Sequence, residues 1–346
     1  MFLRNCWYVA AWQHELDTSR LLARTLLNEP IVFYQHATEG PVALADQCCH
    51  RCAPLSRGRI EDGNLRCMYH GLLFNPAGKC IEIPGQTLIP PKAVVRPYPV
   101  VARNKLVWIW MGDPAQADPS LIPDTYALEH PDWRYRPGYM FYRANYQNIV
   151  DNVLDFSHLS YVHGQTLGGT DLIAKSKPTV EAFDQGVRIK RYMIDGTQPP
   201  FSKRFADMGG NVDRWHFYEL LVPGNMLMES GIQPTGTGVR EGRHQNSLQF
   251  RAYNLITPET DTTTHYFFAL AHGFNLDDPS VTDGVYEEVL KAFKEDGAMI
   301  EAQQQVIDRV KSPQMVVIAA DAGLMQMRRI MDRLIAQENS GIAQVS

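Results

Sequence analysis

The sequence lacks long hydrophobic runs, an excess of either charge, and any cysteine beyond residue 80. No apolar stretch approaches the length of a transmembrane helix, and the N-terminal run M-F-L-R-N-C-W-Y-V-A-A-W is too short and too aromatic for a signal peptide. The net charge of −5 over 346 residues gives no reason to expect a nucleic acid or an anionic membrane as partner. We therefore expect a cytoplasmic protein that binds neither.

The six cysteines, at positions 6, 48, 49, 52, 67 and 80, all lie in the first quarter of the chain. An even count can indicate disulfides, but a long chain without a secretion signal favours metal binding. The segments Cys48-x-His50 and Cys67-x-x-His70 each offer one thiolate and one imidazole. Two cysteines on one iron and two histidines on the other are the ligands of a Rieske [2Fe–2S] cluster. Structural zinc is the alternative, although zinc sites usually place like ligands next to each other.

The strand and helix signals divide the chain into two expected domains, residues 1–118 and 119–346. In the first domain, β-branched and aromatic runs alternate with turn sequences, which predicts a small all-β domain. The second domain contains strand-like runs at 187–193, 213–222, 246–256 and 262–271, and helical patterns at 147–163, 285–310 and 325–337. We expect an α+β helix-grip architecture, in which an antiparallel sheet packs against a long C-terminal helix.

The stretch N-V-L-D-F-S-H-L-S-Y-V-H, at residues 152–163, carries a second candidate metal site. Asn152, Asp155 and His158 stand three residues apart, a spacing that places side chains on one helix face. His163 follows five residues after His158, so both imidazoles can reach one metal only if the helix bends, tightens or ends between them. Two histidines and a carboxylate form the facial triad of non-haem Fe(II) oxygenases. The alternative is a pair of core histidines satisfied by hydrogen bonds.

Asp296 is the candidate third ligand, because it lies one turn before Ile300 within the apolar stripe of the helix at 285–310. A buried, unpaired carboxylate is costly, and metal coordination removes that cost. The alternative is an aspartate at the edge of the stripe, either solvated or capping a kink near Gly297. Glu295 and Glu301 are the other carboxylates near this position.

Four motifs together resemble the oxygenase components of Rieske non-haem iron oxygenases: C-C-H-R-C-A-P-L-S, C-M-Y-H-G-L, V-W-I-W-M-G-D-P-A and N-Y-Q-N-I-V-D-N-V-L-D-F-S-H-L-S-Y-V-H. The similarity is greatest to the vanillate O-demethylase group, which includes methoxybenzoate demethylases and toluenesulfonate methyl-monooxygenases. It implies an N-terminal Rieske domain, a catalytic domain, a [2Fe–2S] cluster, a mononuclear Fe(II) and dioxygen as co-substrate. The implied ligands are Cys48, His50, Cys67 and His70 for the cluster, and His158, His163 and Asp296 for the iron.

The resemblance also implies roles for two further residues and for partner proteins. Asp155 matches a carboxylate that links a Rieske histidine to an iron-ligand histidine of a neighbouring subunit, here His70 and His158, so we expect a homotrimer. Asn152 matches a position close to the iron, and a helix cap is its alternative role. A flavin and iron–sulfur reductase, or a ferredoxin, would deliver electrons from NADH.

The reaction implied by the resemblance is hydroxylation of a methyl or methoxy carbon of a substituted aromatic acid, with O-demethylation and release of formaldehyde favoured. Ring cis-dihydroxylation and methyl hydroxylation of an aryl sulfonate are rival reactions. A Rieske electron carrier is the rival class of protein, but it would need only the first domain. The candidates for pairing with the substrate anion are Arg204, Arg240 and Arg243.

The wall of the substrate pocket is less well determined by the sequence. The candidate lining residues are Met226, Met228, Asn254, His265 and Phe267. Because alternate strand residues face opposite sides of a sheet, the sequence leaves open which of them face the iron.

Overall fold

The computed structural model describes residues 1–167, 171–244, 246–310 and 313–343. Contacts divide the chain into one unit of Met1–Ile122 with Thr257–Asp261, and a second of Pro123–Ile256 with Thr262–Ser346. The expected domain boundary after residue 118 lies close to the first division. The short return of 257–261 to the first unit, at the turn between two strands, was not expected. No helix among the described residues is long and apolar enough to cross a bilayer.

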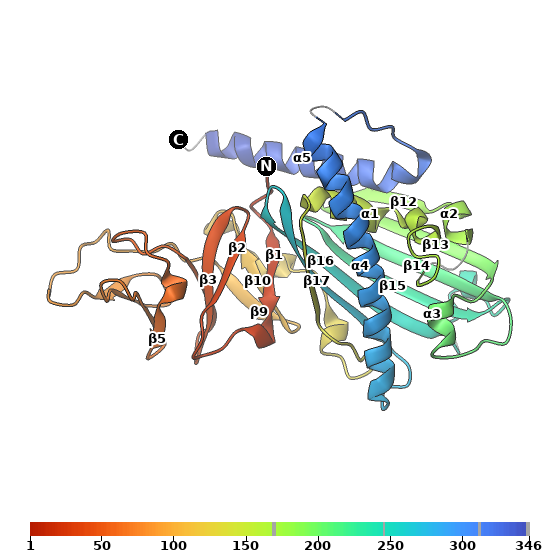
Figure 1. Cartoon of the computed structure of the whole chain (residues 1–346), viewed down its shortest axis with the longest axis horizontal. Helices are drawn as coiled ribbons and strands as arrows, with labels where there is room; N and C mark the ends of the chain where they lie inside the picture. Colours follow the sequence, from red (N-terminus) through yellow and green to blue (C-terminus); the bar gives the residue numbers. More distant parts are fainter. Residues whose placement is uncertain (168–170, 245, 311–312, 344–346) are drawn as a thin grey trace. The chain divides into compact units, whose positions relative to one another are not determined.

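The first unit is built from three small antiparallel sheets (Figure 1). One contains β1 (Trp7–Trp12), β10 (Leu106–Trp110) and β9 (Val100–Arg103), and the next contains β2 (Leu22–Leu26), β3 (Glu29–His36) and β4 (Gly40–Ala45). The third contains β5 (Arg59–Glu61), β6 (Asn64–Arg66), β7 (Leu73–Phe74) and β8 (Cys80–Glu82). The all-β prediction for this part is confirmed. The apolar stretch at residues 65–74 forms parts of two short strands, because the chain leaves the sheet to form the loop at Cys67–His70.

The second unit contains one seven-stranded antiparallel sheet. Its order is β11 (Gly138–Tyr142), β17 (Thr263–His272), β16 (Leu248–Thr260), β15 (Asn225–Pro234), β14 (Val212–Leu221), β13 (Gly186–Gly196) and β12 (Thr179–Phe183). The helices of this unit are α1 (Tyr146–Leu154), α2 (Leu172–Lys175), α3 (Pro200–Lys203), α4 (Pro279–Arg309) and α5 (Ala322–Ala343). β11 and β12 were not predicted from the sequence. Met226 and Met228 were expected on a strand, but the range of β15 was not predicted, because N-M-L-M-E-S-G-I-Q-P has few β-branched residues.

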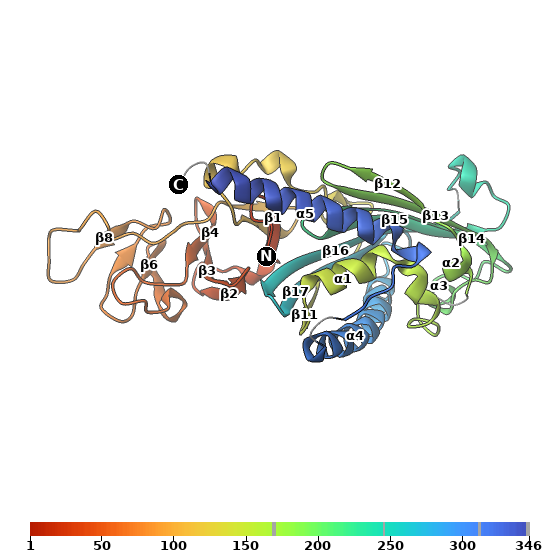
Figure 2. The ribbon, with the colours of Figure 1, turned by 90° about the horizontal axis from the view of Figure 1, so that it is seen from above.

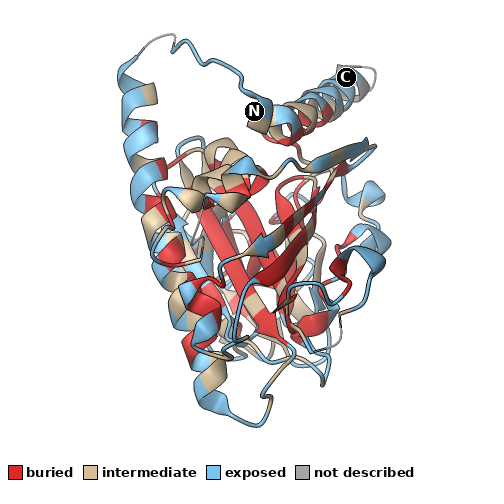
Figure 3. Ribbon diagram, turned by 90° about the vertical axis from the view of Figure 1, so that its right-hand side faces the viewer, coloured by how far each residue is buried: buried red, intermediate tan, exposed pale blue. Residues whose placement is uncertain are grey.

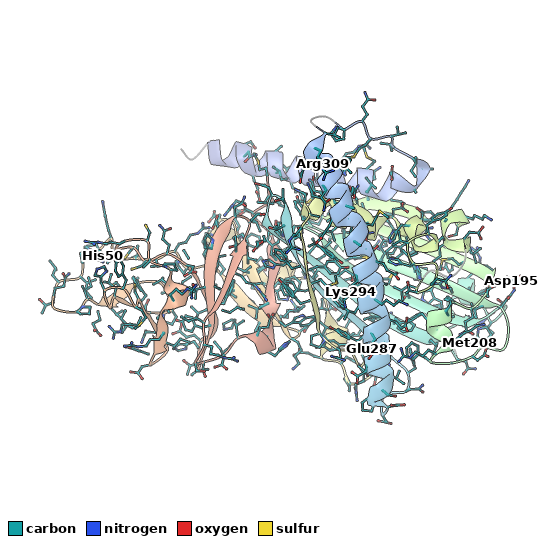
Figure 4. All side chains as sticks on the ribbon, viewed as in Figure 1. His50, Asp195, Met208, Glu287, Lys294 and Arg309 are labelled. Carbon is teal, nitrogen blue, oxygen red and sulfur yellow. The ribbon has the colours of Figure 1, made fainter. Side chains whose placement is uncertain are left out.

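The long helix α4 runs across the sheet and contacts β17 and β11, whereas α5 contacts β13 and β12 (Figures 1 and 2). The buried side of α4 carries Val285, Val289, Ala292, Asp296 and Ile300. Figure 3 shows the central strands as largely buried, with α4 buried along only part of its circumference. Glu287 and Lys294 are exposed, and both are labelled on α4 in Figure 4. The predicted α+β architecture, a sheet covered by a long C-terminal helix, is confirmed.

Gly297 allows α4 to lie close to β11. A Cβ at this position would come within 2.8 Å of Tyr142 Cε1. The Tyr142 ring cannot withdraw freely, because its hydroxyl donates a hydrogen bond of 3.0 Å to the carbonyl oxygen of Phe293. Because residue 297 is a glycine, α4 lies close to the sheet at this point, and so does the preceding residue, Asp296.

Replacing Gly297 by alanine should lower the free energy of unfolding by about 1–3 kcal/mol, because the added methyl group overpacks this contact. Gly284→Ala is the matched control on the same helix. Its new methyl group would meet only the end of the half-exposed Arg204 side chain, at 3.1 Å. Urea denaturation followed by circular dichroism measures both variants. Equal stability of Gly297→Ala and Gly284→Ala would show that the close approach at Gly297 is not needed.

Candidate metal centre and substrate cavity

His158, His163 and Asp296 converge on one point in the second unit. Each offers one ligand atom, and these three atoms lie within 4.8 Å of one another. The Oδ1 atom of Asp296 is 3.4 Å from His158 Nε2 and 3.1 Å from His163 Nε2. His163 and Asp296 are buried, and His158 is partly buried. The structure thus brings together the two imidazoles and the carboxylate that were predicted from separate parts of the sequence.

The backbone reaches this arrangement because α1 ends at Leu154, between the two parts of the predicted helix at 147–163. Asp155 has an extended backbone, and its side chain caps the short 3₁₀ helix Phe156–Ser160 by accepting hydrogen bonds from Ser157 N at 2.8 Å and Ser157 Oγ at 2.7 Å. The expectation that Asn152, Asp155 and His158 share one helix face is therefore wrong. The break is what allows His158 and His163 to face the same point.

Hydrogen bonds orient both imidazoles. His158 Nδ1 lies 2.5 Å from the backbone oxygen of Asp155, and His163 Nδ1 lies 2.8 Å from Glu295 Oε2. Glu295 also accepts a bond of 2.9 Å from Thr166 Oγ1, which fixes its own position. In each ring this leaves Nε2 directed at Asp296, the arrangement found in metal-bound histidines whose far nitrogen is held by an oxygen. Glu295 was considered as a ligand from sequence, and the structure gives it this supporting contact instead.

Asn152 contributes a side-chain amide to the same cluster. Its Nδ2 donates a hydrogen bond of 3.0 Å to Asp296 Oδ1 and lies 3.5 Å from His158 Nε2. Helix α1 already has a cap at Asn145, whose side chain accepts from Gln147 N, so Asn152 does not have the alternative capping role. The amide holds the carboxylate oxygen that both imidazoles face.

The electrostatics of the cluster favour a bound cation. Burial lowers the pKa of His158, despite the opposing effect of Asp296. Burial also acts to lower the pKa of His163, but the neighbouring Asp296 and Glu295 carboxylates outweigh it and raise that pKa. A proton shared on His163 is thus one way to balance the buried Asp296 charge. A divalent metal bound by two neutral imidazoles and one carboxylate is the other, and this donor set suits Fe(II).

The first unit presents the four other predicted ligands on two loops. Cys48 and Cys67 are buried, whereas His50 and His70 are exposed, and the two imidazole rings lie 4.5 Å apart. Burial, together with the neighbouring Cys67 thiol, raises the pKa of the Cys48 thiol to about 12. Figure 4 labels His50 on its loop. Two inner thiols and two outer imidazoles fit a cluster with cysteine on one iron and histidine on the other.

Gly71, directly after His70, makes the second loop possible. Its φ of +76° is unfavourable for other residues, and a Cβ there would lie 2.8 Å from Pro84 Cγ. Gly71 N donates a hydrogen bond of 3.0 Å to the oxygen of Cys67, which closes the loop around the ligand pair.

Comparison with known families agrees with this arrangement. A family model described as the Rieske [2Fe–2S] domain matches residues 6–99, and one described as the vanillate O-demethylase oxygenase C-terminal domain matches residues 142–337. The chain belongs to the vanillate O-demethylase family of Rieske oxygenases. The predicted enzyme class, cofactor set and role as the oxygenase component of a multicomponent system are thereby confirmed. Such a component receives its electrons from a reductase or ferredoxin.

Individual relatives cover nearly the whole oxygenase. The toluene-4-sulfonate monooxygenase system iron–sulfur subunit of Comamonas testosteroni is 50% identical over 99% of this chain and 100% of its own length. The vanillate O-demethylase oxygenase subunit of Pseudomonas sp. strain HR199 is 33% identical over 98% and 96%. The crystal structure of dicamba monooxygenase with non-heme iron and dicamba has a TM-score of 0.81 and 31% identity, with 99% of each chain covered.

A cavity of about 110 Å³ opens at the metal cluster of the oxygenase, and its wall is mainly apolar. Its volume is of the same order as that of the roughly 150 Å³ engineered protein cavity that binds benzene, so it suits one aromatic ring. The sheet side of the wall is formed by Arg214, His216, Met226, Met228, Ser230, Phe250, Ala252, Asn254, Ala269 and Leu270. The side chains from the loops and helices are Asn152, Val153, Phe156, His158, Leu159, His163, Leu167, Phe201, Val289, Phe293 and Asp296.

Of the pocket candidates named from the sequence, Met226, Met228 and Asn254 line this cavity, and His265 and Phe267 do not. His265 Nδ1 instead lies 2.9 Å from the Tyr139 hydroxyl. His265 and Phe267 alternate along β17 with Tyr266 and Phe268, whose rings contact Phe293 in the cavity wall, so His265 and Phe267 turn toward the other face of the sheet.

The arginines proposed from the sequence do not line the cavity. Arg204 pairs with Glu287 and Glu288 on α4, and Arg243 pairs with Glu241. Arg240 lies over the Tyr192 ring. The sequence analysis missed Arg214 and His216 as pocket residues. The available signal was the alternation V-D-R-W-H-F-Y on β14, which places Arg214, His216 and Tyr218 on one face.

Replacing Glu295 by glutamine should weaken metal binding by about 10- to 100-fold, because the charged acceptor behind His163 is lost. Titration of the metal-free second site with Fe(II) or Co(II) measures this directly, without turnover. Glu301→Gln is the matched control, since Glu301 lies on the same helix and accepts a hydrogen bond from Arg143 N, at 2.9 Å, rather than from a histidine. Equal affinities of the two variants would contradict the supporting role of Glu295.

Proposed function

We propose that this oxygenase component hydroxylates a methyl or methoxy carbon of a small aromatic acid. The observation that carries the proposal is the buried cluster of two imidazoles and one carboxylate that opens directly into a ring-sized, mainly apolar cavity. His158, His163 and Asp296 would hold the iron. The iron would supply dioxygen activation, for which the Rieske cluster provides electrons. Cys48, His50, Cys67 and His70 would hold that cluster.

The residues of the chain position the substrate and exclude water. Met226, Met228 and Phe250 provide an apolar surface against which an aromatic ring can lie. Phe156 stacks on Tyr218, with ring centroids 4.7 Å apart, and lies 6.4 Å from the His158 ring. A substrate held between these groups would place a substituent close to the metal cluster. Asn152 would keep Asp296 oriented, and this amide–carboxylate bond supports its proposed role in catalysis.

Two reactions fit this site, and relatives favour each of them. The 50% identity to a toluene-4-sulfonate monooxygenase subunit supports hydroxylation of an aryl methyl group. The family match to vanillate O-demethylase supports O-demethylation, which the sequence analysis favoured. Because the former relative is more similar to this chain, at 50% identity against 33% for a vanillate O-demethylase subunit, we place methyl hydroxylation of an aryl sulfonate first and O-demethylation second.

The products distinguish these reactions. The purified oxygenase, with NADH and a surrogate reductase, is given 4-toluenesulfonate, a methoxybenzoate and benzoate, and the products are separated by chromatography. A hydroxylated methyl carbon gives a benzylic alcohol. A hydroxylated methoxy carbon is a hemiacetal, which collapses to a phenol and formaldehyde. We expect the benzylic alcohol at the highest rate, and a cis-diol as the main product would contradict the proposal.

We further propose a homotrimer in which Asp155 links His70 of one subunit to His158 of the next. Its carboxylate binds Ser157 but keeps unused acceptor capacity, since a carboxylate has about four lone-pair sites. The exposure of His70 leaves this histidine accessible to a second copy. Native mass spectrometry tests the assembly.

We also propose that the two domains span residues 1–118 and 119–346. We propose a cytoplasmic location, because NADH is available there to a partner reductase.

Replacing Asp155 by asparagine should slow the transfer of electrons from the reduced cluster by about 10- to 100-fold while both metal sites stay loaded. Stopped-flow absorbance of the cluster after mixing with dioxygen and substrate measures the rate. Ser157→Ala is the control, because it removes a hydrogen bond to Asp155 but keeps the carboxylate. If Asp155→Asn reoxidises as fast as the wild type, Asp155 does not connect the two centres.

A further inference from the structure

A cluster of polar side chains lies on the wall of the otherwise apolar cavity. Strand β14 turns Arg214 and His216 to the same face of the sheet, and Ser230 on β15 stands directly opposite His216. All three side chains line the cavity and are buried, with 7–8% of their surface exposed. The next residue in this row is Phe250, which pairs with Ser230. A cation, an imidazole and a hydroxyl are thus collected at one place on an apolar surface.

Arg214 places a permanent charge in this wall. Burial lowers the pKa of its guanidinium only to about 10, so the group is charged at neutral pH. One terminal nitrogen donates a hydrogen bond of 3.4 Å to the backbone oxygen of Leu167. The planar guanidinium presents several donors, which suits a carboxylate or sulfonate.

His216 adds a neutral donor or acceptor beside this charge. Burial, reinforced by Arg214 and Arg191, lowers the pKa of His216 well below its usual value, so the ring is neutral. Its Nδ1 is buried and has no hydrogen-bond partner among the residues that the structure describes. Such an unsatisfied atom is uncommon in a folded protein, and a ligand in the cavity would satisfy it.

The polar cluster and the metal cluster line the same cavity. The Phe156 ring packs near both, with its centroid 5.6 Å from that of His216 and 6.4 Å from that of His158. A substrate with an anionic group at one end of a benzene ring and a methyl group at the other end could contact both clusters from within this cavity. The anion would face the arginine, and the methyl group would face the metal ligands.

We propose that Arg214, His216 and Ser230 form the subsite that binds the sulfonate or carboxylate of the aromatic substrate and thereby determines which carbon is hydroxylated. This inference rests on the proposed function, because it assigns the anionic end of the same substrate. Three donors favour a sulfonate, with its three oxygens, over a carboxylate. The surface arginines considered above, which pair with glutamates or lie on an aromatic ring, have no part in this subsite.

Equilibrium binding tests the subsite without turnover. Isothermal titration calorimetry is performed on the anaerobic, metal-loaded oxygenase with 4-toluenesulfonate, 4-methylbenzoate and the neutral methyl 4-tolyl sulfone. The variants are Arg214→Met, which removes the charge, and Arg214→Lys, which keeps the charge without the planar fork. Arg188→Met is the control: Arg188 lies on the neighbouring strand β13, is half-exposed, and pairs with Glu181 and Glu219 outside the cavity.

We expect Arg214→Met to bind the two anions about 10- to 100-fold more weakly than the wild type, because a hydrogen-bonded charge pair is lost. Its affinity for the neutral sulfone should stay within about threefold of the wild-type value. Arg214→Lys should fall between these values, and Arg188→Met should match the wild type. Retained sulfone binding also demonstrates that the variant is folded. A larger loss for the sulfonate than for the carboxylate would identify the sulfonate as the preferred anion.

Two results would overturn the inference. The first is that Arg214→Met loses as much affinity for the sulfone as for the anions, and the second is that the wild type binds the sulfone as tightly as the anions. If Arg214→Met folds too poorly to bind the sulfone, the comparison is made on Arg214→Lys, for which unchanged anion affinity contradicts the proposal. Failure of the proposed reaction is distinguishable from these results. In that case the wild type would still bind the anions through Arg214 but would form neither benzylic alcohol nor formaldehyde.

Discussion

The buried carboxylate of Asp296 is the constraint on which the catalytic part of this oxygenase depends. It lies between two imidazoles and accepts a hydrogen bond from Asn152, deep in the contact between α4 and the rest of the unit. The two imidazoles, the carboxylate and the hydrogen bonds that orient them form a donor set that suits a divalent metal. Two features of the chain produce the site. Helix α1 ends before His158, and Gly297 lets α4 approach β11.

The cavity next to this cluster combines two requirements that usually conflict. An aromatic ring needs an apolar surface, and an acidic substituent needs a positive charge. The sheet satisfies both, because its inner face carries methionine, phenylalanine and alanine over most of its area and concentrates its polar groups around Arg214. The Phe156 ring packs near both His216, which stands beside that charge, and His158 in the metal cluster. The position of the anion, rather than a close steric fit, would then select the carbon that reacts.

Much of this site could be predicted from the sequence, because its candidate ligands follow local patterns. Histidines five residues apart can reach one metal only if the helix bends, tightens or ends between them, and in the structure it ends at Leu154. An aspartate inside an apolar helical stripe is unusual enough to indicate a ligand, and Asp296 does lie beside both histidines. The paired Cys and His motifs predicted the Rieske domain for the same reason.

The rest could not be predicted, because it depends on contacts between distant parts of the chain. The face that each strand turns to the cavity is set by the sheet register, so His265 was considered and Arg214 was overlooked. The role of Glu295 depends on its distance from His163, 132 residues earlier in the chain. The range of strand β15 was not predicted, because its sequence has few β-branched residues. Substrate recognition is therefore the least predictable part of the fold.

The most direct test of the central claim is to measure the iron content of Asp296→Ala together with its Rieske electron paramagnetic resonance signal. In our proposal different residues hold the cluster and the mononuclear iron, so the variant should lose only the mononuclear iron and all product formation. The Rieske signal of the reduced protein should be unchanged. If Asp296→Ala keeps the iron content and the activity of the wild type, the cluster of His158, His163 and Asp296 is not the site of oxygen chemistry.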